Sequence, residues 1–202
     1  MCLERSVRML VVGIDLAGVE TRPTGFCILD GMNATTCILH TDREIIKRCV
    51  KAKPKVIAID APLALPKGRK SLTERSNIHL RECDRQLLKM KIKFFPITLG
   101  PMRKLTERGI KLRKILERKG FEVIETYPGA AQDILQIPRK QKGLFKLKNG
   151  LQKIGIKGLR ASMTGDELDA VTAALVGKMY IEKNYLAIGD PKEILMILPK
   201  RV

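Results

Sequence analysis

Three short, largely hydrophobic runs in this chain each stop at an acidic residue. The runs are four to six residues long and end at Asp15, Asp60 and Glu125. Apolar runs of this length are typical of buried β-strands. A carboxylate beside a buried strand is costly unless a cation meets it. The pattern therefore favours a sheet in which several strand ends present acidic groups.

The order of the predicted elements indicates a mixed α/β fold. Hydrophobic patterning predicts strands at 7–15, 24–30, 34–40, 55–60 and 121–125, and a last short strand near 194–198. Asp30-Gly31 is typical of a hairpin turn, so the first three strands are expected to pair as hairpins. Helices are predicted at 43–52, near 79–92, at 106–119, near 129–136 and at 165–182. Residues 139–160 are basic and interrupted by glycines.

The helix predicted at 165–182 carries acidic residues at its start. Thr164 and Glu167 fit a capping box, which accounts for Glu167 as a cap. Asp166 and Asp169 are three residues apart and share one side of the helix. Small residues at 170, 173, 174 and 177 would let the helix approach a sheet closely. Acidic residues also suit a helix N-terminus through its dipole, but Asp169 lies one turn inside an amphipathic helix.

These carboxylates suit divalent cations. Mg²⁺ and Mn²⁺ prefer hard oxygen ligands, and two such ions about 4 Å apart can stabilise both oxygens of a phosphodiester displacement. The expected metal ligands are Asp15, Asp60, Asp166 and Asp169, and the expected catalytic residues are Asp15, Asp60, Glu125 and Asp169. The alternatives are structural: Asp15 in a turn, Asp60 capping a strand end, and Glu125 as a surface residue.

The chain is strongly basic, with 39 Lys and Arg against 21 Asp and Glu and a net charge of +18. Such a charge attracts nucleic acid, anionic membranes or acidic proteins. Segments 103–119 and 139–160 are candidate contacts for a phosphate backbone. The candidate substrate-binding residues are Arg81, Arg108, Lys111 and Tyr127. Aromatic residues make up only 4% of the chain, so phosphate contact is expected more than base stacking.

Several other classes are disfavoured. The five cysteines include no Cys-x-x-Cys pair, which argues against a zinc knuckle or a disulfide framework. The first apolar stretch is too short for a signal sequence or a membrane span, so we expect a cytosolic protein that does not use a membrane. Neither a P-loop nor a dinucleotide-binding glycine motif is present. We expect one domain over 1–202, with an insertion at 61–105.

Five motifs occur in a fixed order: Gly-Ile-Asp-Leu-Ala-Gly at 13–18, Ile-Asp-Ala-Pro-Leu at 59–63, Arg-Glu-Cys-Asp at 81–84, Glu-Thr-Tyr-Pro at 125–128 and Asp-Glu-Leu-Asp-Ala at 166–170. From about residue 9 onward, the ordered set resembles an uncharacterised family of predicted nucleases with the ribonuclease H-like fold. The resemblance implies a mixed sheet of five main strands with helices on both faces. The insertion at 61–105, after the fourth strand, departs from a minimal ribonuclease H-like domain. The resemblance also implies acidic site residues at Asp15, Asp60 and Asp169, with Asp166 nearby. The last motif is similar to the final acidic motif of Holliday-junction resolvases.

The sequence therefore predicts a nuclease that depends on Mg²⁺ or Mn²⁺, with DNA and RNA both candidate substrates. Arg81 has two open roles, which are binding the scissile phosphate and pairing with Asp84. One alternative function is a nucleic-acid-binding module with a vestigial acidic site. Another is an ATP-binding relative of the actin and sugar-kinase group, because residues 13–18 resemble its first phosphate loop. That group needs two such subdomains, and 202 residues are too few.

Overall fold

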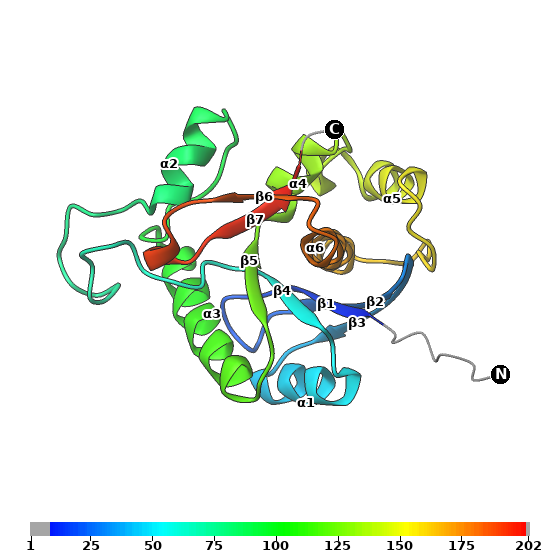
Figure 1. The fold of residues 1–202 in the computed structure, drawn as a ribbon, viewed down its shortest axis with the longest axis horizontal. Coiled ribbons are helices and arrows are strands. Elements are labelled where there is room, and N and C mark those ends of the chain that lie inside the picture. Colours follow the sequence, from blue (N-terminus) through cyan, green and yellow to red (C-terminus); the bar gives the residue numbers. More distant parts are fainter. Residues whose placement is uncertain (1–8, 201–202) are drawn as a thin grey trace.

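The computed structural model describes residues 9–200, and seven strands within that range form one mixed sheet in the order β3-β2-β1-β4-β5-β7-β6 (Figure 1). The strands are β1 (Leu10–Asp15), β2 (Thr24–Asp30), β3 (Asn33–Leu39), β4 (Val56–Asp60), β5 (Val123–Thr126), β6 (Tyr185–Ile188) and β7 (Met196–Pro199). The expected five-stranded sheet was wrong, because β7 extends it beyond β5 and β6 pairs with β7. Residues 7 and 8 of the first predicted strand lie outside the described residues.

The strand pairing brings the acidic strand ends to one edge of the sheet. β1, β2 and β3 are antiparallel, as the hairpin signal at Asp30-Gly31 predicted. β1, β4 and β5 are parallel, so their carboxyl ends lie together. In this register Asp15 is directly opposite Asp60, and Asp60 is opposite Thr126, which follows Glu125. The strand order thus places three sequence-distant acids on neighbouring strands.

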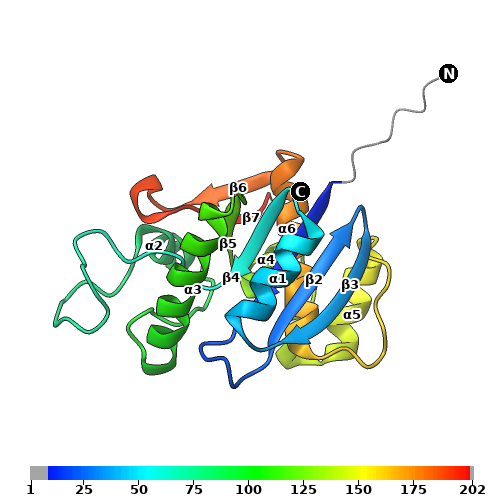
Figure 2. The ribbon, with the colours of Figure 1, turned by 90° about the horizontal axis from the view of Figure 1, so that it is seen from below.

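Helices cover both faces of the sheet (Figures 1 and 2). They are α1 (Asp42–Ala52), α2 (Glu82–Lys89), α3 (Gly100–Arg118), α4 (Pro128–Ile134), α5 (Leu144–Lys153) and α6 (Gly165–Ile181), with short 3-10 turns η1 (Lys140–Lys142) and η2 (Pro191–Glu193). α1 and α3 pack on one face, and α4, α5 and α6 pack on the other. None of the helices in the described part of the chain is long and apolar enough to cross a membrane.

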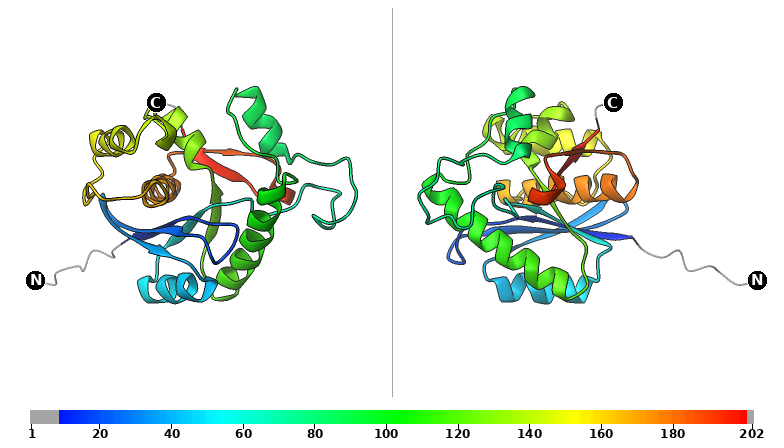
Figure 3. Two further views of the ribbon diagram at one scale, coloured as in Figure 1. Left: turned by 180° about the vertical axis from the view of Figure 1, so that it is seen from behind. Right: turned by 60° about the vertical axis from the view of Figure 1, so that its left-hand side comes forward.

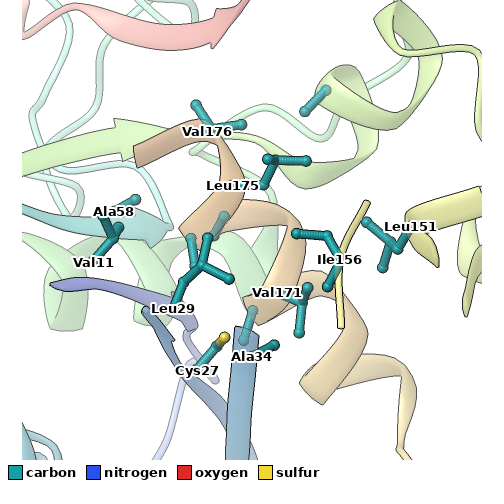
Figure 4. Close-up of a cluster of buried hydrophobic side chains, with 14 of the residues drawn as sticks. Val11, Cys27, Leu29, Ala34, Ala58, Leu151, Ile156, Val171, Leu175 and Val176 are labelled. Atoms are coloured by element: carbon teal, nitrogen blue, oxygen red, sulfur yellow. The ribbon is translucent and has the colours of Figure 1, made fainter. Parts of the chain in front are cut away.

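α6 is the central helix of the second face, and Figure 4 shows its side chains against the strands and α5. The helix is buried on most sides, so the expectation of a simple amphipathic helix was wrong. The predicted capping box of Thr164 and Glu167 is confirmed. The predicted close approach to the sheet is also confirmed, because a Cβ on Gly13 would lie 2.1 Å from the Ala170 carbonyl oxygen. This tight packing holds the start of α6 against the acidic strand ends.

The segment between β4 and α2 extends from the body of the molecule beside α2 and α3 (Figure 3). The buried carboxylate of Glu193 ties it to the C-terminal part of the chain. Its two oxygens accept hydrogen bonds from the backbone N–H groups of Lys67, at 2.5 Å, and Glu82, at 2.6 Å. The guanidinium of Arg69 donates to four carbonyl groups of the same segment, those of Ser71, Leu72, Glu74 and Ile78. These polar contacts order a segment that has little regular structure.

Candidate active site

Four acidic side chains meet at the carboxyl edge of the sheet. Asp15 and Asp60 lie at the ends of adjacent strands, while Asp166 and Asp169 lie in the first turns of α6. We refer to these four as the carboxylate cluster. The Nζ atom of Lys140 lies 3.6 Å from Asp15 Oδ2, 3.5 Å from Asp166 Oδ1 and 2.8 Å from Asp169 Oδ2. One ammonium group therefore joins the strand and helix parts of the cluster.

The carboxylate cluster is short of positive charge. Burial, together with Asp169 and Asp166, raises the pKa of Asp15 to about 7 against the opposing effect of Lys140. Burial, together with Asp15 and Asp169, raises the pKa of Asp60 well above its usual value. Burial disfavours the charge of Lys140, yet Asp15 and Asp169 raise its pKa overall. The single ammonium thus does not offset the crowding of the acids, and a further cation would find a favourable potential here.

The chemistry of the cluster fits Mg²⁺ or Mn²⁺, because all of its donors are hard carboxylate oxygens. Across residues 9–200, no three or more His, Cys, Asp or Glu side chains are arranged as a ready-made metal site. Lys140 instead supplies a positive charge between three of the carboxylates. An ion bound by Asp15 and Asp169 together would take the place of the Lys140 ammonium.

Glu125, the other expected catalytic residue, is fully buried next to the cluster. Its Oε2 atom accepts hydrogen bonds from the backbone N–H of Leu63 and from Arg81 Nη1, both at 2.7 Å. Its Oε1 atom is buried and has no hydrogen-bond partner in the described part of the chain. Glu125 raises the pKa of Asp60, so the two groups are close enough to repel each other. The ion pairs of Lys140 are instead with Asp15, Asp166 and Asp169.

The structure gives Arg81 a structural contact with two acids. It is 1% exposed, and its Nη2 atom lies 3.3 Å from Asp84 Oδ1 while Nη1 binds Glu125. Its backbone N–H also donates to Asp84 Oδ2 at 2.8 Å. Of the two roles left open by the sequence, the pairing with Asp84 is therefore present.

Arg108 was expected to bind substrate, but its guanidinium is engaged within the protein. It is 7% exposed and donates to Asp42 Oδ1 at 2.8 Å and to the carbonyl oxygens of Ala17 and His40 at 2.7 and 2.6 Å. These contacts hold the loop after β1 against the start of α1. Lys111, on the same helix α3, is exposed to solvent. Of these two predicted substrate-binding residues, Lys111 alone has its charged group on the surface.

Tyr127 lies beside the cluster rather than in it. Its hydroxyl donates to the carbonyl oxygen of Lys93 at 2.7 Å and accepts from Arg139 Nη1 at 3.2 Å. The Arg139 guanidinium also lies over the Tyr127 ring, 5.6 Å from its centroid. These contacts join the residues after β5 to both the insertion and the segment that carries Lys140.

Two polar residues of the site were not found from the sequence. Lys140 was included only as one of many charges in the basic segment 139–160. Gln132 is 1% exposed, and its Nε2 atom donates to Asp169 Oδ1 at 2.7 Å and to Thr172 Oγ1 at 3.2 Å. This contact fixes the orientation of the Asp169 carboxylate. No local pattern marks either residue, because both act through the packing of distant segments.

A cavity of about 280 Å³ opens directly beside the carboxylate cluster. Asp60, Asp169 and Lys140 form part of its lining, and Glu125 and Arg81 form another part. The insertion and the start of α3 contribute apolar side chains to its wall. Concave, partly apolar cavities with a few polar groups are the usual form of ligand sites. The carboxylate cluster thus adjoins a cavity large enough for a small organic group.

No protein-family model and no curated protein matches this chain. Solved structures do match it. RuvC of Thermus thermophilus in complex with Holliday junction substrate has a TM-score of 0.53 and 14% identity, over 87% of this chain and 96% of that chain. A second Thermus thermophilus RuvC structure matches over the same shares with a TM-score of 0.48 and 14% identity. At this identity the first likeness is one of fold, and the chain has the ribonuclease H-like fold of RuvC.

Proposed function

We propose that this protein is a metal-dependent nuclease that hydrolyses phosphodiester bonds at the carboxylate cluster. The observation that carries the proposal is the meeting of Asp15 and Asp60 with Asp166 and Asp169 at one edge of the sheet. The deficit of positive charge there supports cation binding. The fold is that of RuvC, a protein solved in complex with a Holliday junction substrate.

In this proposal, Asp15, Asp60, Asp166 and Asp169 hold one or two Mg²⁺ or Mn²⁺ ions. Such ions activate a water molecule and stabilise the charge that develops on phosphate oxygens. Gln132 holds the Asp169 carboxylate in place through Oδ1. An outer partner of this kind fixes the geometry of a metal-binding carboxylate.

Lys140 gives the site a second source of positive charge. Its side chain is 35% exposed, so the ammonium can move from the carboxylates into solvent without unpacking the core. We propose that it leaves Asp15 and Asp169 when a divalent ion binds and then contacts a substrate phosphate. Exposed basic residues are sequence neighbours of residues that line the cavity: Arg103 and Lys104 lie between Met102 and Leu105 in α3, and Lys142 follows Gln141. These charges would hold the phosphate backbone of DNA or RNA.

The direct test compares wild type with Asp15→Asn on labelled single-stranded, duplex and branched DNA and RNA, with Mg²⁺ or Mn²⁺ and with EDTA. We expect wild type to cleave only with metal, and Asp15→Asn to bind the substrate without cutting it, because the amide keeps the size but not the charge. Asp30→Asn is the matched control, since Asp30 lies at the opposite edge of the sheet, paired with Leu10. Equal cleavage by wild type and Asp15→Asn would place the activity elsewhere.

A second candidate function is a nucleic-acid-binding module without catalysis. The ion pairs of Lys140 favour this candidate, because they supply the cluster with a cation from the chain itself. This module would bind nucleic acid through its basic surface and would not cleave it with any metal ion. Absence of cleavage by wild type on every substrate, together with retained binding, would support it.

A further inference from the structure

We propose that the cavity beside the carboxylate cluster binds one nucleobase of the substrate, and that it prefers bases with an exocyclic amino group. The inference rests on the proposed function in that the occupant belongs to the nucleic acid that the cluster would cut. It adds a base-reading site to a surface otherwise expected to contact phosphates.

The position of the cavity fits a nucleotide. Asp60, Asp169 and Lys140 line it, so a phosphate at the carboxylate cluster has its own or a neighbouring base within reach of the cavity. The volume of about 280 Å³ is at the small end for ligand sites, which suits one base better than a longer segment.

The cavity also offers aromatic and aliphatic surface for a flat ring. Phe94, Ile97 and Met102 contribute to its lining from the insertion and the start of α3. Phe95 lines it as well, although 69% of this residue is exposed to solvent. An exposed aromatic ring beside a cavity provides a platform on which a base can stack. In a chain with few aromatic residues, the gathering of three of them here, Phe94, Phe95 and Tyr127, is informative.

The carboxylate of Glu125 would make the cavity selective among the bases. It lines the cavity, and Arg81 and the backbone of Leu63 hold its Oε2 atom. Among residues 9–200 the buried Oε1 atom has no hydrogen-bond partner, and a buried acceptor left unpaired destabilises the free protein. A ligand that donates a hydrogen bond to Oε1 would remove that cost.

The donor chemistry of the bases then sets the preference. Adenine, cytosine and guanine each carry an exocyclic NH₂ group that can donate to a carboxylate. Uracil and thymine have a ring N–H between two carbonyl oxygens, and those oxygens would face the negative charge of Glu125. Arg81 forms ion pairs with both Asp84 and Glu125 and so fixes the Glu125 carboxylate, which makes Arg81 a positioning residue. The cavity should therefore discriminate against uracil and thymine.

The test measures binding of AMP, CMP, GMP and UMP to the metal-free protein by titration calorimetry. We expect the three amino-bearing nucleotides to bind several-fold more tightly than UMP. Phe95→Ala should weaken their binding by about tenfold, as expected for the loss of one stacking ring. Phe145→Ala is the matched control, because Phe145 is also 69% exposed but does not line the cavity.

A second variant, Glu125→Gln, tests the acceptor itself. Its amide can donate as well as accept, so the discrimination against UMP should shrink or reverse in the folded variant. If the variant does not fold, as judged by circular dichroism, the comparison of Phe95→Ala with Phe145→Ala decides. UMP binding as tightly as AMP, or Phe95→Ala binding as tightly as wild type, would overturn the base site.

These outcomes are separate from those of the nuclease test. Base preference without cleavage would leave the base site in place and remove the nuclease proposal. Metal-dependent cleavage that is lost in Asp15→Asn, with no base preference in the titrations, would remove the base site alone.

Discussion

At the scale of single residues, the unusual feature is a set of acids with too little positive charge around them. Asp15 and Asp60 have raised pKa values because burial and neighbouring carboxylates act together against Lys140. Both acids were predictable from the sequence, since each follows a short apolar run. Lys140 was not, because its contact with the acids depends on how η1 packs against the start of α6 rather than on any local pattern.

The raised pKa of Asp15 predicts a pH dependence of stability in the absence of metal. The folded-state pKa is about 7, above the usual 3.8, so the folded protein holds a proton that the unfolded chain releases. The stability from this group is fully present below about pH 4 and is lost as pH rises through 7. Asp15→Asn should therefore be more stable than wild type at pH 8, by on the order of a few kcal/mol, and nearly equal to it at pH 4.

Thermal unfolding of both proteins in EDTA between pH 4 and pH 8 measures this difference. The quantity to follow is the stability of wild type minus that of Asp15→Asn at each pH, because the contributions of the other carboxylates then cancel. A constant difference between wild type and Asp15→Asn across the range would show that Asp15 has an ordinary pKa.

At the scale of elements, the signals that were local in sequence were the ones that predicted structure. The capping box of Thr164 and Glu167 located the start of α6, and Lys53-Pro54 located the end of α1. α5 was not predicted, because lysines and Gly150 obscure its apolar face. β6 was missed since it is four residues long and partly exposed, and its pairing with β7 is what makes it a strand.

The close contact between α6 and β1 gives a test at this scale. A Cβ on Gly13 would lie 2.1 Å from the Ala170 carbonyl oxygen and 2.4 Å from the Ala174 nitrogen, both backbone atoms that a rotamer change cannot move. Gly13→Ala should therefore force α6 away from β1 and destabilise the protein by roughly 1–3 kcal/mol or more. The same shift would separate Asp169 from Asp15.

Urea unfolding of Gly13→Ala measures the stability loss. Metal-dependent cleavage without urea, at a low temperature where the variant stays folded, measures the effect on the site. Gly100→Ala is the control, because a Cβ there meets nothing within 4 Å. We expect the control to match wild type within about 0.5 kcal/mol. A Gly13→Ala protein as stable as the control would show that α6 tolerates a wider separation from the sheet.

At the scale of the whole molecule, the sequence predicted the order of the first five strands. The resemblance supplied the fold type and the helices on both faces. The last strand, predicted near 194–198, is present as β7. The number of strands in the sheet was wrong because no local pattern reveals the pairing of β7 with β5 and β6. The edge at which the acids meet follows from parallel pairing of β1, β4 and β5. Which side chains complete the site depends on segments that pack across that edge.

The net charge of +18 also belongs to this scale, and it predicts strongly salt-dependent binding of nucleic acid. Each phosphate neutralised by Lys or Arg releases condensed counterions, so affinity should fall steeply as salt rises, by about tenfold or more between 50 and 200 mM. Fluorescence anisotropy of a labelled duplex at several salt concentrations measures the slope. A flat response would mean that the basic surface does not contact the phosphate backbone.

The bonds from Glu193 to Lys67 and Glu82 also affect how the molecule is made. During synthesis the chain emerges from its N-terminus, so the insertion leaves the ribosome well before residue 193 does. The backbone groups that Glu193 accepts from remain exposed to water during that interval. The wall of the cavity is therefore completed only after residue 193 has been made, and a chain that stops short of residue 193 would carry all four cluster acids without the anchored wall beside them.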